Sequence, residues 1–169
     1  ALLCMPVLAE EWTDIGQLAI PSFGSQAVVL HPYIYIIGGY SAESGQPHPY
    51  IQRFNPHTNQ CEVVDSLAAP RAYFVAQAVG DSVLIFGGES DTFENATSAF
   101  SWKPGGQPRF LFMHPYLNRI KATGGIYENK IVIVGGNTDP AFGDAAIPYV
   151  VEFELTNGSL VYENSDMVL

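Results

Sequence analysis

The chain of 169 residues carries 7 basic and 17 acidic side chains, a formal net charge of -10. This sign is wrong for a surface that gathers phosphate groups by counterion release, which argues against nucleic acid and anionic membranes as partners. With 47% hydrophobic residues the chain can bury a core, and its 16 glycines, 12 prolines, 9 tyrosines and 10 phenylalanines favour strands joined by tight turns. We therefore predict an all-β fold.

The start of the chain fits the end of a signal peptide. Residues 1–9 are mostly apolar, and Val7 and Ala9 suit cleavage before Glu10. A strand or a disordered stub is the alternative interpretation of the same stretch, which is too short to span a membrane. On this basis we predict a secreted or extracellular protein, with a cytoplasmic one as the alternative.

Two acceptor triplets for N-glycosylation agree with secretion. They begin at Asn95 and Asn157, although the Asn-Gly pair of the second is also a turn signal. The two cysteines, Cys4 and Cys61, cannot form a disulfide framework, and we expect Cys61 to act as a small hydrophobic residue. The predicted glycosylation sites are therefore Asn95 and Asn157.

A unit of about 49 residues recurs three times. Apolar runs end in Gly38-Gly39, Gly87-Gly88 and Gly135-Gly136, at steps of 49 and 48 residues. Such a period indicates stacked supersecondary units rather than one irregular domain.

Each unit contains four short apolar segments separated by turn residues, as an antiparallel meander requires. In chain order the predicted strands are 25–30, 33–37, 50–55 and 61–66, then 73–79, 82–86, 97–102 and 109–113, then 122–127, 130–134, 149–155 and 159–164. The three units span about 22–66, 71–113 and 119–165, and a further short strand is predicted at about 11–15.

These features together resemble the kelch repeat. The resemblance is carried by the period, the double glycines and the stretch Phe54-Asn55-Pro56-His57-Thr58-Asn59, which precedes a position 49 residues after Trp12. The repeats depart from the family pattern, because the family's tryptophan in the fourth strand is present only as Trp12. Cys61 and Arg109 occupy the matching positions of the next two repeats. Phe54, Phe100 and Phe153 likewise replace a usual tyrosine.

The resemblance implies a kelch-type β-propeller of the class that includes galactose oxidase. Residues 10–169 would supply three four-stranded blades of a six- or seven-blade ring, because three blades are too few to close one. The segment 11–15 would complete the last blade, while a dimer of two three-blade halves is the alternative. We expect Tyr33, Tyr35, Phe86, Phe100 and Phe153 to pack between blades, and blade faces left without a neighbour to favour self-association.

No catalytic motif is visible in the sequence. The four histidines lack ligand spacing, and the acidic loop residues Glu89, Asp91, Glu94, Asp139 and Asp144 lack the order of a calcium loop. We predict no metal, no cofactor and no catalytic residues within this chain.

The leading hypothesis is a non-catalytic binding module. In such a meander the loops before the first strand and after the second share one face, which collects residues 40–49, 66–73, 89–96, 114–121 and 137–147. Arg71, Arg119 and Lys121 lie just before first strands and Tyr73 begins one. These four are the predicted binding residues, able to hold an acidic group of a protein or glycan. A framework role for the two arginines is the alternative.

A second hypothesis belongs to another class. The chain would be part of a kelch-class enzyme, either a copper radical oxidase or an isomerase resembling the sialate epimerases, with its catalytic groups on blades outside this chain. Since fold does not decide function in propellers, the two hypotheses stay open at the level of sequence.

Overall fold

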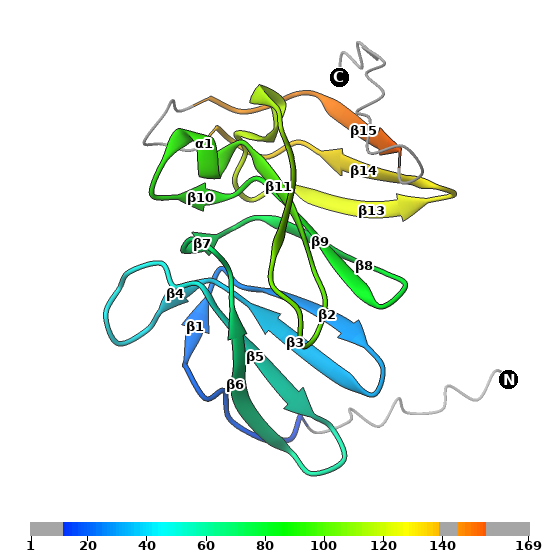
Figure 1. Ribbon diagram of the computed structural model, residues 1–169. Helices are drawn as coiled ribbons and strands as arrows, with labels where there is room; N and C mark the ends of the chain where they lie inside the picture. The colour runs from blue at the N-terminus through cyan, green and yellow to red at the C-terminus, as the bar shows by residue number, and fades with distance from the viewer. Residues whose placement is uncertain (1–11, 139–144, 155–169) are drawn as a thin grey trace, which may run out of the picture.

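The computed structural model describes residues 12–138 and 145–154, which form three antiparallel sheets stacked side by side (Figure 1). The first sheet contains β2 (Gln26–Leu30), β3 (Tyr33–Ile37), β5 (Tyr50–Asn55) and β6 (Gln60–Ser66). The second contains β8 (Val75–Val79), β9 (Ser82–Phe86), β11 (Ser98–Trp102) and β12 (Arg109–Met113). The third contains β13 (Thr123–Tyr127), β14 (Lys130–Val134) and β15 (Val150–Glu154). The prediction of an all-β chain of kelch-like blades is confirmed.

In each blade the strands follow one another in space as they do in sequence. All eleven agree with their predicted bounds to within two residues, because period-two alternation and Gly-rich turns mark them clearly. The strand predicted at 159–164 lies outside the described residues, as do Asn157 and the predicted signal remnant 1–9.

The hydrophobic core lies between blades. The sides that the first two blades turn toward each other bury Tyr35, Ile37, Ile51, Phe74, Ile85 and Trp102, and a second cluster joins the next pair through Phe86, Ile131, Ile133 and Phe153. Burying an aliphatic or aromatic side chain contributes about 1.5–3 kcal/mol, so these layers hold the stack together. The inter-blade packing expected for Tyr35, Phe86 and Phe153 is confirmed, and Tyr33 and Phe100 pack partly buried beside the first cluster.

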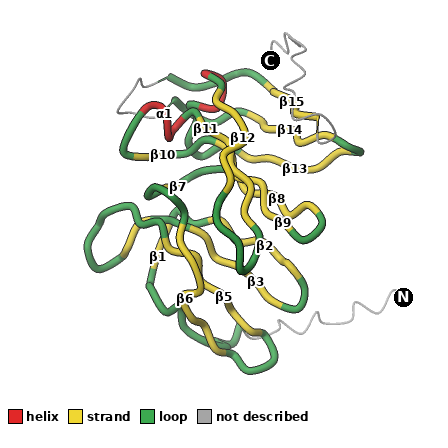
Figure 2. The backbone as a smooth tube through the Cα atoms, in the orientation of Figure 1, coloured by secondary structure: helices red, strands yellow, loops and turns green. Residues whose placement is uncertain are grey.

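Short two-stranded ribbons and helical turns lie at one end of the blades. Two ribbons pair β1 (Ser22–Phe23) with β4 (Tyr40–Ser41) and β7 (Arg71–Ala72) with β10 (Glu89–Ser90), and a single bridge joins Ile120 to Asn137 in the third blade. One helical turn, α1 (Phe93–Ala96), and a 3-10 turn, η1 (Pro115–Leu117), lie at the same end (Figure 2). Two-residue strands are too short for any periodicity to reveal, so the sequence did not predict them.

The two ends of the blades differ in their connections. The irregular segments around β4, β10 and α1 lie on the left in Figure 1, and the tight turns between β2 and β3, β8 and β9, and β13 and β14 lie on the right. We call these ends the loop face and the turn face.

The ring is not closed, and the segment before β1 runs beside the first blade without joining its sheet. Residues 12–18 have no regular secondary structure, and Trp12 is fully exposed. Ile20 exchanges two hydrogen bonds with the side chain of Gln52, at 2.8 and 3.0 Å. The blade that residues 11–15 are predicted to complete is not among the described residues, so that prediction and the total blade number stay predictions.

Within the described residues, no helix is long and apolar enough to cross a membrane.

Candidate functional site on the loop face

The double glycines connect each blade to the next. The N–H groups of Gly39 and Gly88 donate to the carbonyl oxygens of Arg71 and Arg119, at 2.7 and 3.0 Å. A Cβ on Gly87 would lie 2.2 Å from the Leu117 carbonyl oxygen, closer than any side chain tolerates. Glycine is therefore required here by the close approach of the next blade's backbone as well as by its positive φ.

Arg71 is buried in the framework of the second blade. Its side chain is 1% exposed, and its guanidinium donates to the carbonyl oxygens of Gly87 and Asn95 and to the Ser98 hydroxyl. Burial lowers the Arg71 pKa to about 10, partly opposed by the negative charge of Asp91. The guanidinium thus links the end of β9, the helical turn α1 and the start of β11 within its own blade.

Arg119 repeats this arrangement in the third blade, 48 residues later. It is 2% exposed and donates to the carbonyl oxygens of Tyr116, Gly135 and Tyr149 at 2.6, 3.2 and 3.4 Å. Burial lowers its pKa to about 10. Its Nη2 has no hydrogen-bond partner among the described residues.

The first blade has Ser22 at the position of these arginines, 49 residues before Arg71. A histidine is buried near this end of the blade instead. His48 is 5% exposed, donates its backbone N–H to Gly39 and stacks its ring on Tyr50 at 5.6 Å. In the described part of the chain neither ring nitrogen has a hydrogen-bond partner, and burial lowers the His48 pKa.

A second connection between blades runs along a backbone ladder formed by Gly24, Tyr73 and Lys121. These residues occupy the same position of the three repeats, and each has a left-handed φ, of 68°, 53° and 56°. Tyr73 N–H donates to the Gly24 carbonyl at 2.8 Å, and Lys121 N–H donates to the Tyr73 carbonyl at 3.0 Å. Only glycine adopts this conformation without strain, so the tyrosine and the lysine are held there by the fold.

Side chains of the ladder join an aromatic cluster on the loop face. Phe23 is 51% exposed and stacks on Tyr40 at 5.2 Å, and Tyr73 packs against Tyr40 at 6.0 Å. The Lys121 ammonium lies 5.3 Å from the centre of the Tyr73 ring, a cation–π contact. The Tyr40 hydroxyl donates to Glu89, which joins the first blade to the second.

Beside this cluster a cleft of about 500 Å³ opens between the loops of the first two blades. Its lining residues are Tyr40, Gly45, Gln46, Pro47, Pro70, Glu89, Ser90 and Asp91. The cleft is acidic, because it combines two carboxylates with no basic side chain.

The comparisons with known proteins agree with this architecture. The family model of the Kelch motif matches residues 21–68, the stretch from just before β1 to just beyond β6. The first of the three repeats thus carries a kelch motif, which supports a kelch-repeat family for the chain. Its second and third kelch units repeat the double glycine and the ladder residue of the matched unit, at steps of 49 and 48 residues. Comparison with curated proteins finds no match.

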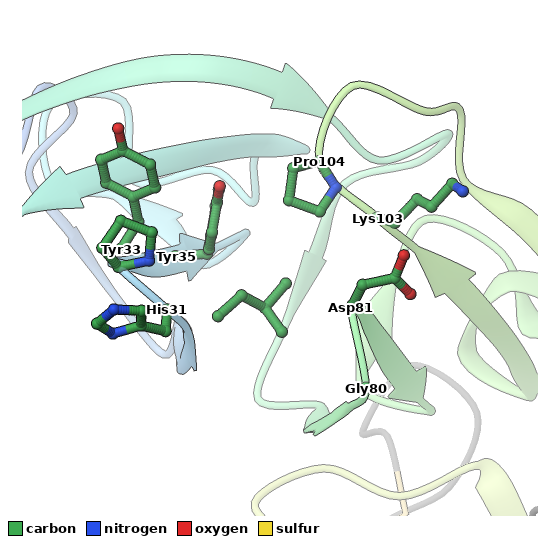
Figure 3. A pocket seen from close by; sticks show the side chains of 9 residues that line it. His31, Tyr33, Tyr35, Gly80, Asp81, Lys103 and Pro104 are labelled. Atoms are coloured by element: carbon green, nitrogen blue, oxygen red, sulfur yellow. The ribbon is translucent and has the colours of Figure 1, made fainter.

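The turn face of the kelch blades also carries a cleft, of about 590 Å³. Figure 3 shows His31, Tyr33 and Tyr35 of the first blade on one side and Asp81, Lys103 and Pro104 of the second on the other. Sequence reasoning missed this cleft, because it treated the turn face as a row of tight turns only.

The four predicted binding residues divide into two pairs. Tyr73 and Lys121 reach the surface of the loop face, whereas Arg71 and Arg119 are buried against carbonyl groups. The geometry of the arginines is that of the framework role left open above. Phe23, Tyr40 and Glu89 were missed, although Tyr40, Glu89 and Asn137 share one position of the kelch unit and could have been found by aligning the repeats.

Other predicted sites have a place in the same region. Asn95, the predicted glycosylation site, lies in α1, where its side chain donates to Asp91 at 2.7 Å. Among the residues that the structure describes, no group of three or more His, Cys, Asp or Glu side chains could hold a metal ion.

Proposed function

We propose that this kelch domain is a non-catalytic interaction module whose loop face binds a protein partner. The observation that carries the proposal is the backbone strain at Tyr73 and Lys121. Left-handed residues other than glycine cost about 1–2 kcal/mol each, and such strain clusters at functional sites. The first blade has Gly24 at the same position, so the backbone itself does not need these side chains.

The composition of the surface supports the same proposal. Aromatic residues are enriched at protein interfaces, where they supply contact area at low conformational cost. Phe23, Tyr40 and Tyr73 form such a surface beside an exposed Lys121. Arg71 and Arg119 would support the loops from below rather than touch the partner.

Several finer points belong to the proposal. A glycan is the second class of ligand, since exposed rings such as Phe23 can stack on sugars, and the enzyme hypothesis concerns blades outside this chain. We propose a secreted location and Asn95 and Asn157 as glycosylation sites on the sequence argument alone. Exposed apolar side chains such as Val29 and Val134 would support self-association where no neighbouring blade covers them.

Site-specific photo-crosslinking in the cells that make the protein tests the proposed surface. A photoreactive phenylalanine analogue would replace Phe23 on the loop face and, as a matched control, Tyr127 beside the β13–β14 turn, which are 51% and 65% exposed. We expect a discrete adduct with another protein from position 23 and none from position 127. Adducts from both positions, or from 127 alone, would contradict the proposal.

A further inference from the structure

The loop-face cleft between β4 and β10 combines features that point to one kind of group. One wall comes from the first blade, with Tyr40 and Pro47, and the other from the second, with Pro70, Glu89 and Asp91. Its volume of about 500 Å³ lies within the range of sites that hold small molecules or single side chains. The cleft therefore combines the rings of Tyr40, Pro47 and Pro70 with two carboxylates on one wall.

The two carboxylates have no ion-pair partner among the described residues. The two salt bridges of the described chain join Arg53 to Glu62 and Lys130 to Glu152, both outside the cleft. Arg71, whose charge Asp91 partly balances, gives its hydrogen bonds to Gly87, Asn95 and Ser98 and is closed off from the cleft by its burial. The negative charge of the cleft is thus left open to a partner.

Internal hydrogen bonds hold both carboxylates in place. The Tyr40 hydroxyl donates to Oε1 of Glu89, and Asn95 and Ser90 donate to Oδ1 of Asp91 at 2.7 and 3.2 Å. The hydrogen bonds to Asp91, that from Asn95 foremost, lower its pKa and keep it ionised.

We propose that this cleft binds an arginine side chain of the protein partner. The proposal rests on the proposed function and adds the chemistry of the ligand. A guanidinium has five donors in a planar fork, which suits two carboxylates that line one wall of a cleft, while Pro47 and Pro70 can cover the methylene groups. The net charge of -10 favours approach of a basic partner.

The test uses the intact protein and a defined probe. The probe is the blocked peptide acetyl-Gly-Arg-Gly-Arg-Gly-amide with a neutral fluorophore, and its control carries citrulline, which is neutral, in place of arginine. Binding is followed by fluorescence anisotropy at low salt. The variant Glu89→Gln with Asp91→Asn removes both charges, and Glu94→Gln with Glu43→Gln removes two exposed charges of the same face outside the cleft.

We expect the cleft variant to weaken binding of the arginine peptide about tenfold or more, as the loss of charge-assisted hydrogen bonds requires, and the control variant to change it less than about twofold. The citrulline peptide should bind the native protein about as weakly as the arginine peptide binds the cleft variant. Unchanged melting temperatures verify that both variants fold.

Equal weakening by the two variants would assign the attraction to net charge and overturn the proposal. Absence of binding to the native protein, or equal binding of the citrulline peptide, would overturn it as well. Either result combined with a crosslink from position 23 would leave the loop face as the interaction surface and remove only the arginine site.

Discussion

The two ends of the blades use glycine in the same conformation with different consequences. Gly87 on the loop face and Gly80 on the turn face have φ values of 62° and 60°. A Cβ at Gly87 would meet the Leu117 carbonyl at 2.2 Å, whereas nothing lies within 4 Å of one at Gly80. The first glycine is needed for contact between blades and the second only for its own turn.

Hydrogen bonds show the same asymmetry. The four backbone bonds that tie Gly39, Gly88, Tyr73 and Lys121 to a neighbouring blade all lie at the loop face. At the turn face the first two blades separate enough to leave the cleft of Figure 3. The comparison teaches that the loop face carries the backbone hydrogen bonds between blades, while at the described turn face the blades meet only through side chains.

The sharpest test of this difference is the pair Gly87→Ala and Gly80→Ala. Gly80→Ala should cost about 1–2 kcal/mol, the price of a left-handed alanine. Gly87→Ala should cost more than about 3 kcal/mol, because the clash of its Cβ with the Leu117 carbonyl adds to the cost of a left-handed alanine. Denaturant unfolding of the intact protein measures both, and equal losses would show that the blades are not held together at Gly87.

A second test removes the buried guanidiniums. We expect Arg71→Ala to cost about 2–4 kcal/mol, since it leaves buried carbonyl groups unpaired and opens a cavity. Arg119→Ala should cost less, because two of its three hydrogen bonds are long, at 3.2 and 3.4 Å. Unfolding free energies decide the matter. Variants that keep full stability and lose partner binding would return both arginines to the ligand role.

A third test uses the pH dependence of stability. The His48 pKa is lowered in the folded chain from 6.5, so the folded state binds fewer protons than the unfolded state once the pH falls below that value. Stability is therefore full above pH 6.5 and declines on acidification. His48→Gln should flatten this decline, as seen in melting temperatures between pH 7.5 and 5. The lowered pKa of His114 supplies a residual slope, and an unaltered profile would mean that the His48 pKa is the same in the folded and the unfolded chain.

The smallest expected effect is at the backbone ladder. Lys121→Gly relieves the left-handed strain but adds freedom to the unfolded chain, so we expect stability to stay within about 1 kcal/mol of native. Lys121→Val should lose about 1–2 kcal/mol, because a branched Cβ fits this conformation poorly. A thermal melt of each variant measures the difference. Equal stability of the two would mean that residue 121 is free to leave the left-handed region.

The sequence predicted the sheets well because their signal is local. Strands such as 33–37, 82–86 and 130–134 have their predicted bounds, since alternation and the following double glycine lie within a few residues of one another. The burial of Arg71 and Arg119 could not be predicted in the same way. An arginine in a loop before a strand has the same local sequence whether it faces solvent or the Gly87 and Gly135 carbonyls, and only the assembled blade distinguishes the two.

The candidate site was predicted in part for the same reason. The loop face followed from the topology of a meander, and Tyr73 and Lys121 were named on it. The cleft depends on two loops about 49 residues apart, with Tyr40 donating to Glu89 across the blade boundary. No pattern within one repeat contains that contact.

The backbone ladder has a consequence for how such proteins change in evolution. The ladder hydrogen bonds of Gly24, Tyr73 and Lys121 join main-chain groups alone, so each of the two junctions pairs a backbone donor with a backbone acceptor whatever the side chains. A gene segment of 48 or 49 codons could be duplicated, deleted or exchanged without redesigning the junction. The side chain at that position is glycine, tyrosine and lysine in the three units, and the ladder hydrogen bonds use none of these side chains.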